Sequence, residues 1–150
     1  RREKKKAQTD AKRIELENKR LALEEEKQRT EDLPKLEFGN GFQTSPITRE
    51  LKIEIVNTGN DCHITEIRPS NQNWKYLTPR LPIQLGKDRT VNLEFYLPKN
   101  DPVLIKPYSK FTIYFSVLDR HNRIYSTSFN SDIAPSHSSI RFTPLVLVKP

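Results

Sequence analysis

The chain changes character at Leu33-Pro34, and this change limits what it can fold into. Residues 1–32 contain no glycine or proline and consist mainly of charged residues and other good helix formers. All 11 prolines and all 4 glycines come after them, among short runs of β-branched and aromatic residues. Because a residue that precedes proline disfavours the α region, the helix should end here. The sequence therefore predicts a long charged helix over residues 1–32 and a β domain over residues 33–150.

The β domain is predicted from the alternation of apolar and polar side chains. Glu50–Asn57, Arg89–Leu97 and Phe111–Leu118 each place their apolar residues on one face. Turn residues separate seven or eight such short runs, and no βαβ rhythm is present, so we expect a mainly β fold in the form of an antiparallel sandwich. The remaining expected strands are Lys35–Phe38, Cys62–Arg68, Trp74–Leu77, Arg123–Asn130 and Ile140–Val148.

Three local features should interrupt these strands. Gly39-Asn40-Gly41 is expected to end the first strand. Ile64 and Ile67 lie three residues apart, a spacing that predicts a bulge or a bend. Pro144 should leave the last segment as an edge strand or as two short pieces, since proline cannot donate a hydrogen bond to the ladder.

Part of the domain resembles a known fold family. The segments are Leu51–Asn60 (LKIEIVNTGN), Ile64-x-x-Ile67, and Leu81–Lys87 (LPIQLGK) followed by Val91-x-Leu-x-Phe95. Over residues 50–130 they resemble the first half of bacterial immunoglobulin-like and fibronectin type III-like sandwiches. Leu85-Gly86 stands where Pro-Gly is usual, and the cysteine pair of antibody domains is missing. The chain is also similar to bacterial proteins in which a membrane span and a charged helix precede such a domain. The resemblance implies an immunoglobulin-like sandwich with a binding or scaffolding role and no chemistry.

A basic run opens the sequence. Arg1, Arg2, Lys4, Lys5 and Lys6 are opposed only by Glu3, and residues 1–30 hold eleven Lys and Arg against seven Asp and Glu. Such a run is a solvated helix start, a flank that contacts anionic lipid, or a contact to nucleic acid phosphates. Basic residues are unfavourable at a helix N-terminus, and the chain has no Met and begins with Arg, so we expect a helix that continues from upstream in a longer chain.

The helix carries a short heptad pattern. Ala7, Ile14 and Leu21 occupy d positions, with Ala11 and Asn18 at a positions. Asparagine at an a position is typical of parallel dimers, but the seam covers barely two heptads. The helix is therefore expected to be either a solvated spacer or the site of a weak homodimer.

One cluster of the β domain has the composition of an interface. Trp74, Tyr76 and Arg80 lie in a segment that mixes aromatic and basic residues, as interface anchors often do. The alternative for Trp74 is the core, because sandwiches of this kind commonly bury one tryptophan.

The sequence offers little material for chemistry. Cys62 and His63 are adjacent and should point to opposite faces of a strand, while His121 and His137 lie in expected turns. The four glycines form no phosphate-binding motif. We expect no catalytic residues, no metal and no cofactor.

These observations favour a non-catalytic protein-interaction or scaffolding module with a protein partner, in the soluble part of a membrane-tethered protein. The positive-inside rule puts the basic run on the cytoplasmic side; a periplasmic or extracellular location is the alternative. The alternative function is a nucleic-acid-associated accessory protein that uses the basic helix. The remaining positive charge of the β domain is too diffuse to favour nucleic acid as a partner.

Overall fold

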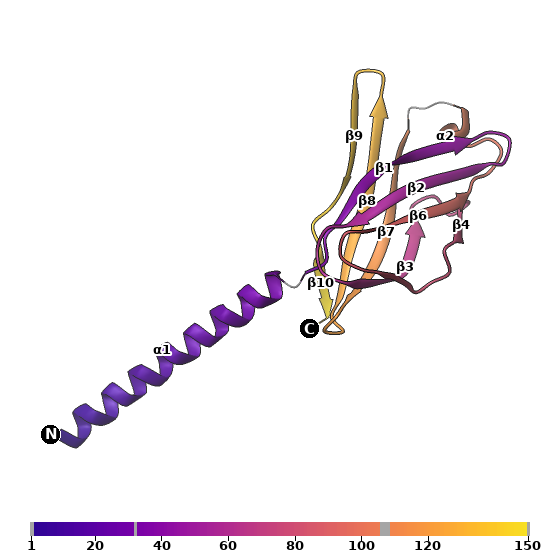
Figure 1. Cartoon of the computed structure of the whole chain (residues 1–150). Coiled ribbons are helices and arrows are strands. Elements are labelled where there is room, and N and C mark those ends of the chain that lie inside the picture. Colours follow the sequence, from indigo (N-terminus) through magenta and orange to yellow (C-terminus); the bar gives the residue numbers. More distant parts are fainter. Residues whose placement is uncertain (1, 32, 106–108, 150) are drawn as a thin grey trace. The chain divides into compact units, whose positions relative to one another are not determined.

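The computed structural model describes residues 2–31, 33–105 and 109–149, without the side chains of residues 2–8, 26, 28–31 and 149. The chain divides into two units, Arg1–Leu33 and Pro34–Pro150, which are considered separately. The second unit is built from antiparallel strands, so the prediction of a mainly β fold after one N-terminal helix is confirmed (Figure 1).

The first unit is the helix α1 (Arg2–Glu31). Its described side chains, at residues 9–25 and 27, are all exposed. Pairs four residues apart form surface ion pairs, with Lys19 Nζ 3.7 Å from Glu15 and Arg20 Nε 3.9 Å from Glu24. Each such pair adds a few tenths of a kcal/mol to helix stability. Within the described part of the chain, no helix combines the length and the apolar character that a membrane crossing requires.

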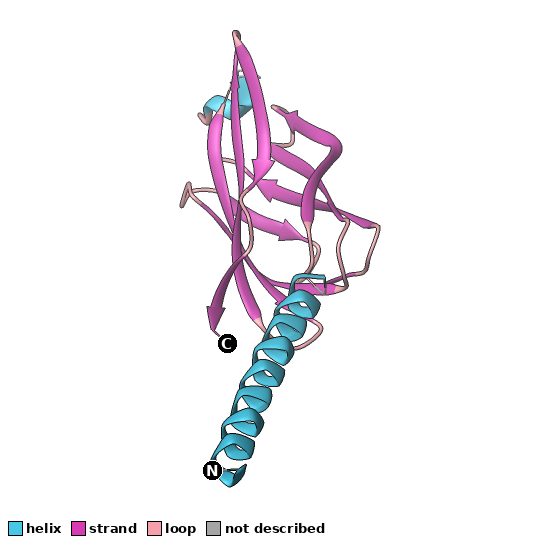
Figure 2. Ribbon diagram, turned by 90° about the vertical axis from the view of Figure 1, so that its left-hand side faces the viewer, coloured by secondary structure: helices cyan, strands magenta, loops and turns pink. Residues whose placement is uncertain are grey.

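The second unit contains two antiparallel sheets (Figure 2). Sheet A has the order β1-β2-β6-β4, and the main path of sheet B is β10-β8-β7-β3-β5, with β9 also paired to β8. The strands of sheet A are β1 (Leu36–Ser45), β2 (Glu50–Asn57), β6 (Arg89–Tyr96) and β4 (Lys75–Thr78). Those of sheet B are β3 (Cys62–Pro69), β5 (Ile83–Leu85), β7 (Lys110–Asp119), β8 (Ile124–Ala134), β9 (His137–Phe142) and β10 (Val146–Lys149). A short helix, α2 (Pro102–Ile105), links β6 to β7.

The strand order corresponds to that of immunoglobulin domains, with two departures. Strands β1-β2-β6-β4 follow the order A-B-E-D, and β3, β7 and β8 correspond to C, F and G. The chain visits β4 in sheet A before it returns to sheet B as β5. Beyond β8, β9 and β10 pair with successive parts of the same strand and form an interrupted edge.

The core lies between the inner faces of the two sheets. Leu51 and Phe95 of sheet A and Ile113 and Phe129 of sheet B are fully buried. Aromatic rings join the sheets, with 5.8 Å between the ring centroids of Phe38 and Phe129. Buried apolar area of this kind is the main source of stability in such a domain.

The prediction of seven or eight strands is wrong, because the described chain forms ten. Strand β5 has only three residues, too few to show a period, and the last expected strand is two strands. Pro144 lies between β9 and β10, which confirms the expected break. The expected irregularity of β3 is also confirmed, as a register shift between Ile64 and Glu66.

The expectation that Gly39-Asn40-Gly41 ends the first strand is wrong. Strand β1 continues through this segment to Ser45, with a register shift between Phe38 and Phe42. The side chain of Glu54 lies across the irregular segment, since a Cβ added to Gly39 would stand 2.8 Å from Glu54 Cγ. The glycines thus let β1 bulge beneath a neighbouring side chain instead of ending the strand.

Asn57, at the end of β2, connects several chain segments from a buried position. Its Oδ1 accepts hydrogen bonds from the backbone N–H of Lys35 (3.1 Å) and Gly59 (3.0 Å). Its Nδ2 donates to the carbonyls of Asn60 (2.8 Å) and Leu85 (3.1 Å). Asn57 therefore anchors the segment just before β1 and the end of β5 to the end of β2.

Candidate functional site: the outer face of sheet B

The basic run lies mostly beyond the structural description. Arg1 is outside the described residues, and so are the side chains of Arg2, Lys4, Lys5 and Lys6. The prediction that these residues contact a membrane or phosphates therefore stays a prediction.

The structure does not gather Trp74, Tyr76 and Arg80 into one exposed cluster. Trp74 is buried at 5% exposure, edge-on to Phe111, so of its two expected positions it occupies the core. Tyr76 is half-buried and donates a hydrogen bond to the carbonyl of Pro79, and burial raises its pKa to about 12. Arg80 is exposed.

Short outward side chains on β8 form the floor of a different candidate site. Because successive residues of a strand face opposite sides, the buried residues Thr127 and Phe129 direct Ser126, Ser128 and Asn130 to the outer face. Two adjoining hollows of about 630 Å³ and 270 Å³ lie over them, with Thr143 lining both. We call these hollows, together with the three floor residues, the β8 groove.

Longer side chains on neighbouring strands form the sides of the groove. On β7, Thr112 lies opposite Asn130 and Tyr114 opposite Ser128. On the other side, Arg141 of β9 lies opposite Asn130, and Val146 of β10 lies opposite Ser126. The groove thus follows β8 between β7 and the interrupted edge strand.

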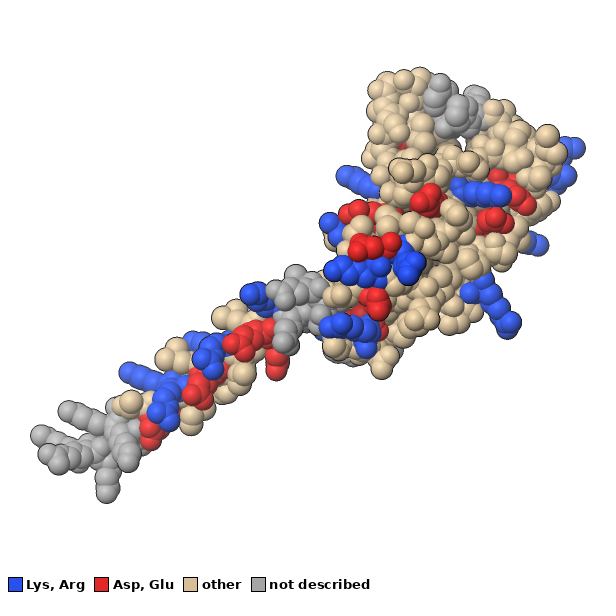
Figure 3. All heavy atoms as spheres, viewed as in Figure 1, with Lys and Arg blue, Asp and Glu red and all other residues tan. Residues whose placement is uncertain are grey.

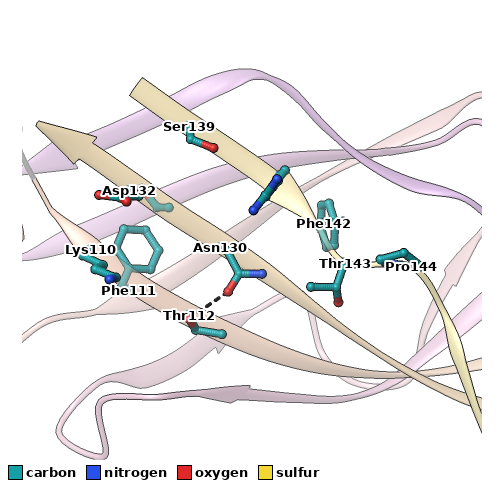
Figure 4. A pocket seen from close by; sticks show the side chains of 11 residues that line it. Lys110, Phe111, Thr112, Asn130, Asp132, Ser139, Phe142, Thr143 and Pro144 are labelled. Carbon is teal, nitrogen blue, oxygen red and sulfur yellow. Dashed lines mark hydrogen bonds between the residues drawn. The ribbon is translucent and has the colours of Figure 1, made fainter. Parts of the chain in front are cut away.

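Hydrogen bonds fix the floor in place. Thr112 Oγ1 donates to Asn130 Oδ1 at 3.0 Å, the contact drawn in Figure 4. Asn130 Nδ2 donates to Ser128 Oγ at 3.0 Å, and the hydroxyls of Ser128 and Thr143 are 3.1 Å apart. Side chains held in this way lose little further conformational entropy when a ligand binds.

The larger hollow carries cations. Lys110 and Arg141 line it, both are exposed, and neither forms an ion pair with a described carboxylate. The carboxylate of Asp132 also lines it, but its Oδ1 lies 3.3 Å from Nε2 of His137. This part of the groove therefore has unused capacity to hold an anionic or hydrogen-bonding group.

The smaller hollow contains two exposed side chains with apolar surface. Tyr114 is 43% exposed and Val146 is 61% exposed. The guanidinium of Arg68 stacks 4.9 Å from the centroid of the Tyr114 ring, and Glu66 accepts a hydrogen bond of 3.2 Å from Ser116 Oγ. Exposed tyrosine and stacked arginine are side chains that protein interfaces favour.

The cysteine and the histidines do not combine into a reactive site. Cys62 is buried in β3, where burial and the Asp61 carboxylate raise the pKa of its thiol to about 12. A thiol with such a pKa carries almost no thiolate at neutral pH and is a poor nucleophile. Among the described residues, no three His, Cys, Asp or Glu side chains lie close enough together to hold a metal ion.

Charges of both signs are mixed on one face of the described chain (Figure 3). Lys52 and Glu94 pair across β2 and β6 at 3.5 Å, and Lys and Arg are interspersed with Asp and Glu on the face drawn in Figure 3.

No protein family model, curated protein or solved structure matches this chain. The resemblance to immunoglobulin-like sandwiches therefore rests on sequence pattern and strand order alone.

Sequence reasoning did not find the β8 groove. The alternation of Ser126, Ser128 and Asn130 with buried residues was readable, but polar residues on an outer face are ordinary. The two hollows depend on side chains of β3, β7, β9 and β10, and these strands come together only through pairing across the sheet.

Proposed function

We propose that this protein is a non-catalytic protein-interaction module and that the β8 groove is its binding surface. The observation that carries the proposal is an ordered floor of short polar side chains between walls that bear Tyr114, Arg68 and unpaired cations. Tyrosine and arginine next to fixed hydrogen-bonding groups supply the contact area and the direction that protein recognition uses.

Site-specific photo-crosslinking tests this function. A benzophenone amino acid replaces Ser126 in the groove or, as a matched control, Asn92 on the outer face of sheet A; both residues are exposed and lie within strands. In cells that produce the protein, we expect discrete protein adducts from position 126. The same adducts should not form from position 92.

The captured protein is then purified and titrated. Ser126→Arg, which fills the groove, should weaken its binding at least about tenfold, whereas Asn92→Arg should leave binding unchanged. Equal adducts from both positions, or binding that survives Ser126→Arg, would contradict the proposal.

We further propose that the basic run places this module beside the cytoplasmic surface of a membrane to which the protein is tethered. Each Lys or Arg near an anionic surface contributes about 1 kcal/mol, so five of them can hold a chain there. Replacing Arg1, Arg2, Lys4, Lys5 and Lys6 with glutamine should abolish sedimentation with phosphatidylserine vesicles. Stronger, steeply salt-dependent binding to duplex DNA would instead favour a nucleic-acid-associated role.

A further inference from the structure

We infer that the β8 groove binds an extended peptide with an acidic residue over Asn130 and an apolar residue over Ser126. This inference rests on the proposed function and specifies the chemistry of the partner. Its basis is the difference between the two hollows, one bearing Lys110 and Arg141 and the other bearing Tyr114 and Val146.

Charge complementarity favours an acidic ligand. Lys110 and Arg141 have no ion-pair partner among the described residues, and these two cations outnumber the one carboxylate of the larger hollow, that of Asp132, which lies opposite Lys110. Residues 34–150 hold 15 Lys and Arg against 10 Asp and Glu, so the unit attracts anions at longer range. A carboxylate between Lys110 and Arg141 would meet two cations that form no ion pair with any residue described by the structure.

The strand sets the spacing of the ligand residues. Arg141 and Thr112 stand opposite Asn130, whereas Val146 stands opposite Ser126, four residues earlier on β8. At about 3.3 Å per residue, the two positions are separated by roughly 13 Å. An extended segment reaches both only if its acidic and apolar residues are about four positions apart.

Tyr114 and Val146 in the smaller hollow select the other end of the peptide. Tyr114 and Val146 leave apolar surface exposed on both sides of Ser126 and Ser128. A branched aliphatic side chain laid between them would cover that surface and gain about 25 cal/mol for each Å² of apolar area it removes from water. A uniformly acidic polymer such as DNA or heparin gains nothing at this end.

The test is an NMR titration of the ¹⁵N-labelled full chain with defined peptides. The probes are the N-acetylated, C-amidated peptide Glu-Glu-Thr-Ser-Val-Leu and the peptide of reversed sequence. The one that binds more tightly shows in which direction the peptide runs relative to β8. The control peptide replaces both glutamates with lysine. We expect shift changes confined to the outward residues of β3 and β7–β10, and at least about tenfold weaker binding of the lysine peptide.

Matched variants locate the charges. Lys110→Gln with Arg141→Gln should weaken binding of the acidic peptide about tenfold. Lys87→Gln with Lys99→Gln makes the same charge change at exposed residues outside the groove, so it should leave the affinity within about twofold. Val146→Ser should weaken binding without changing the preference for glutamate over lysine.

Three results would overturn the inference: shifts scattered over all surface lysines, equal losses from both pairs of variants, or hexaglutamate binding as tightly as the mixed peptide. If these peptides fail while crosslinks from position 126 still identify a protein, the inference fails and the proposed function stands. If the crosslinks fail as well, both fail.

Discussion

The indole Nε1 of Trp74 donates a hydrogen bond of 2.6 Å to the carboxylate of Asp101, and both residues are buried. The same carboxylate accepts from Asn71 Nδ2 (3.2 Å) and from the backbone N–H of Val103 (2.9 Å), at the start of α2. One buried carboxylate therefore joins the segment before β4 to the connection between β6 and β7.

Loss of that carboxylate should be costly. Asp101→Ala leaves the buried indole N–H without its acceptor and removes the first-turn cap of α2, so we expect a loss of about 3 kcal/mol in the free energy of unfolding. Asp101→Asn keeps an acceptor oxygen and should cost about half as much. Urea unfolding followed by Trp74 fluorescence measures both; Trp74 is the single tryptophan.

Glu37→Ala, which breaks only the exposed pair with Lys35, should change stability by less than about 0.5 kcal/mol. An equal effect from Asp101→Ala would show that the buried contacts contribute nothing.

The ionisation of Cys62 predicts how stability depends on pH. Burial and the Asp61 carboxylate raise the pKa of its thiol from 9.0 to about 12 in the folded protein, so the unfolded chain loses this proton first as the pH rises. The stabilisation is complete below about pH 9 and is lost progressively towards pH 12. Between pH 8 and pH 10, the free energy of unfolding of the wild type should fall about 1 kcal/mol more than that of Cys62→Ala. Parallel pH profiles of the two proteins would rule this out. The folded thiol should also react slowly with iodoacetamide at pH 8, and the rate of alkylation should be set by the rate at which the domain unfolds.

The sequence predicts most of the strands because alternation is a local signal. The expected strand Glu50–Asn57 coincides with β2, and the expected irregularity in β3 is present. Helix α2 was missed although its signal was readable, since Asp101 and Pro102 are residues that favour the N-cap and the first helical position. Strand β8 runs to Ala134, beyond the expected Asn130, because β9 pairs with that extension.

The glycines of β1 show why local rules fail in places. Gly39 and Gly41 read as a strand break, but what decides their role is Glu54, which lies on another strand. The β8 groove depends in the same way on side chains from four other strands, β3, β7, β9 and β10. Features that depend on contacts between residues distant in sequence cannot be predicted from local patterns in a single sequence.

The contact between Gly39 and Glu54 can be measured as a coupling. A Cβ at Gly39 would stand 2.8 Å from Glu54 Cγ, whereas one at Gly86 would meet ordinary contacts of 3.5 Å with Arg89 Cγ and Asp61 Oδ1. Gly39→Ala should therefore cost about 1–2 kcal/mol, and much less in a Glu54→Ala background. Gly86→Ala is the matched control and should show no coupling to Glu54→Ala. Chemical unfolding of the single and double variants gives the coupling, and an additive result for Gly39→Ala would place the Glu54 side chain elsewhere.

The heptad pattern of α1 makes a prediction about self-association. Ile14 and Leu21 are 59% and 51% exposed, and Asn18 stands between them at an a position. An a-position asparagine specifies a parallel dimer at a cost in stability, so Asn18→Ile should strengthen dimerisation of the whole chain at least about tenfold. Lys12→Ile adds the same apolar side chain outside the seam and should not. Sedimentation equilibrium over a range of concentrations gives the dissociation constants. If both variants associate to the same extent, the added apolar side chain promotes non-specific association and the seam plays no part. If neither variant associates, α1 is a solvated spacer and any dimer forms through other residues.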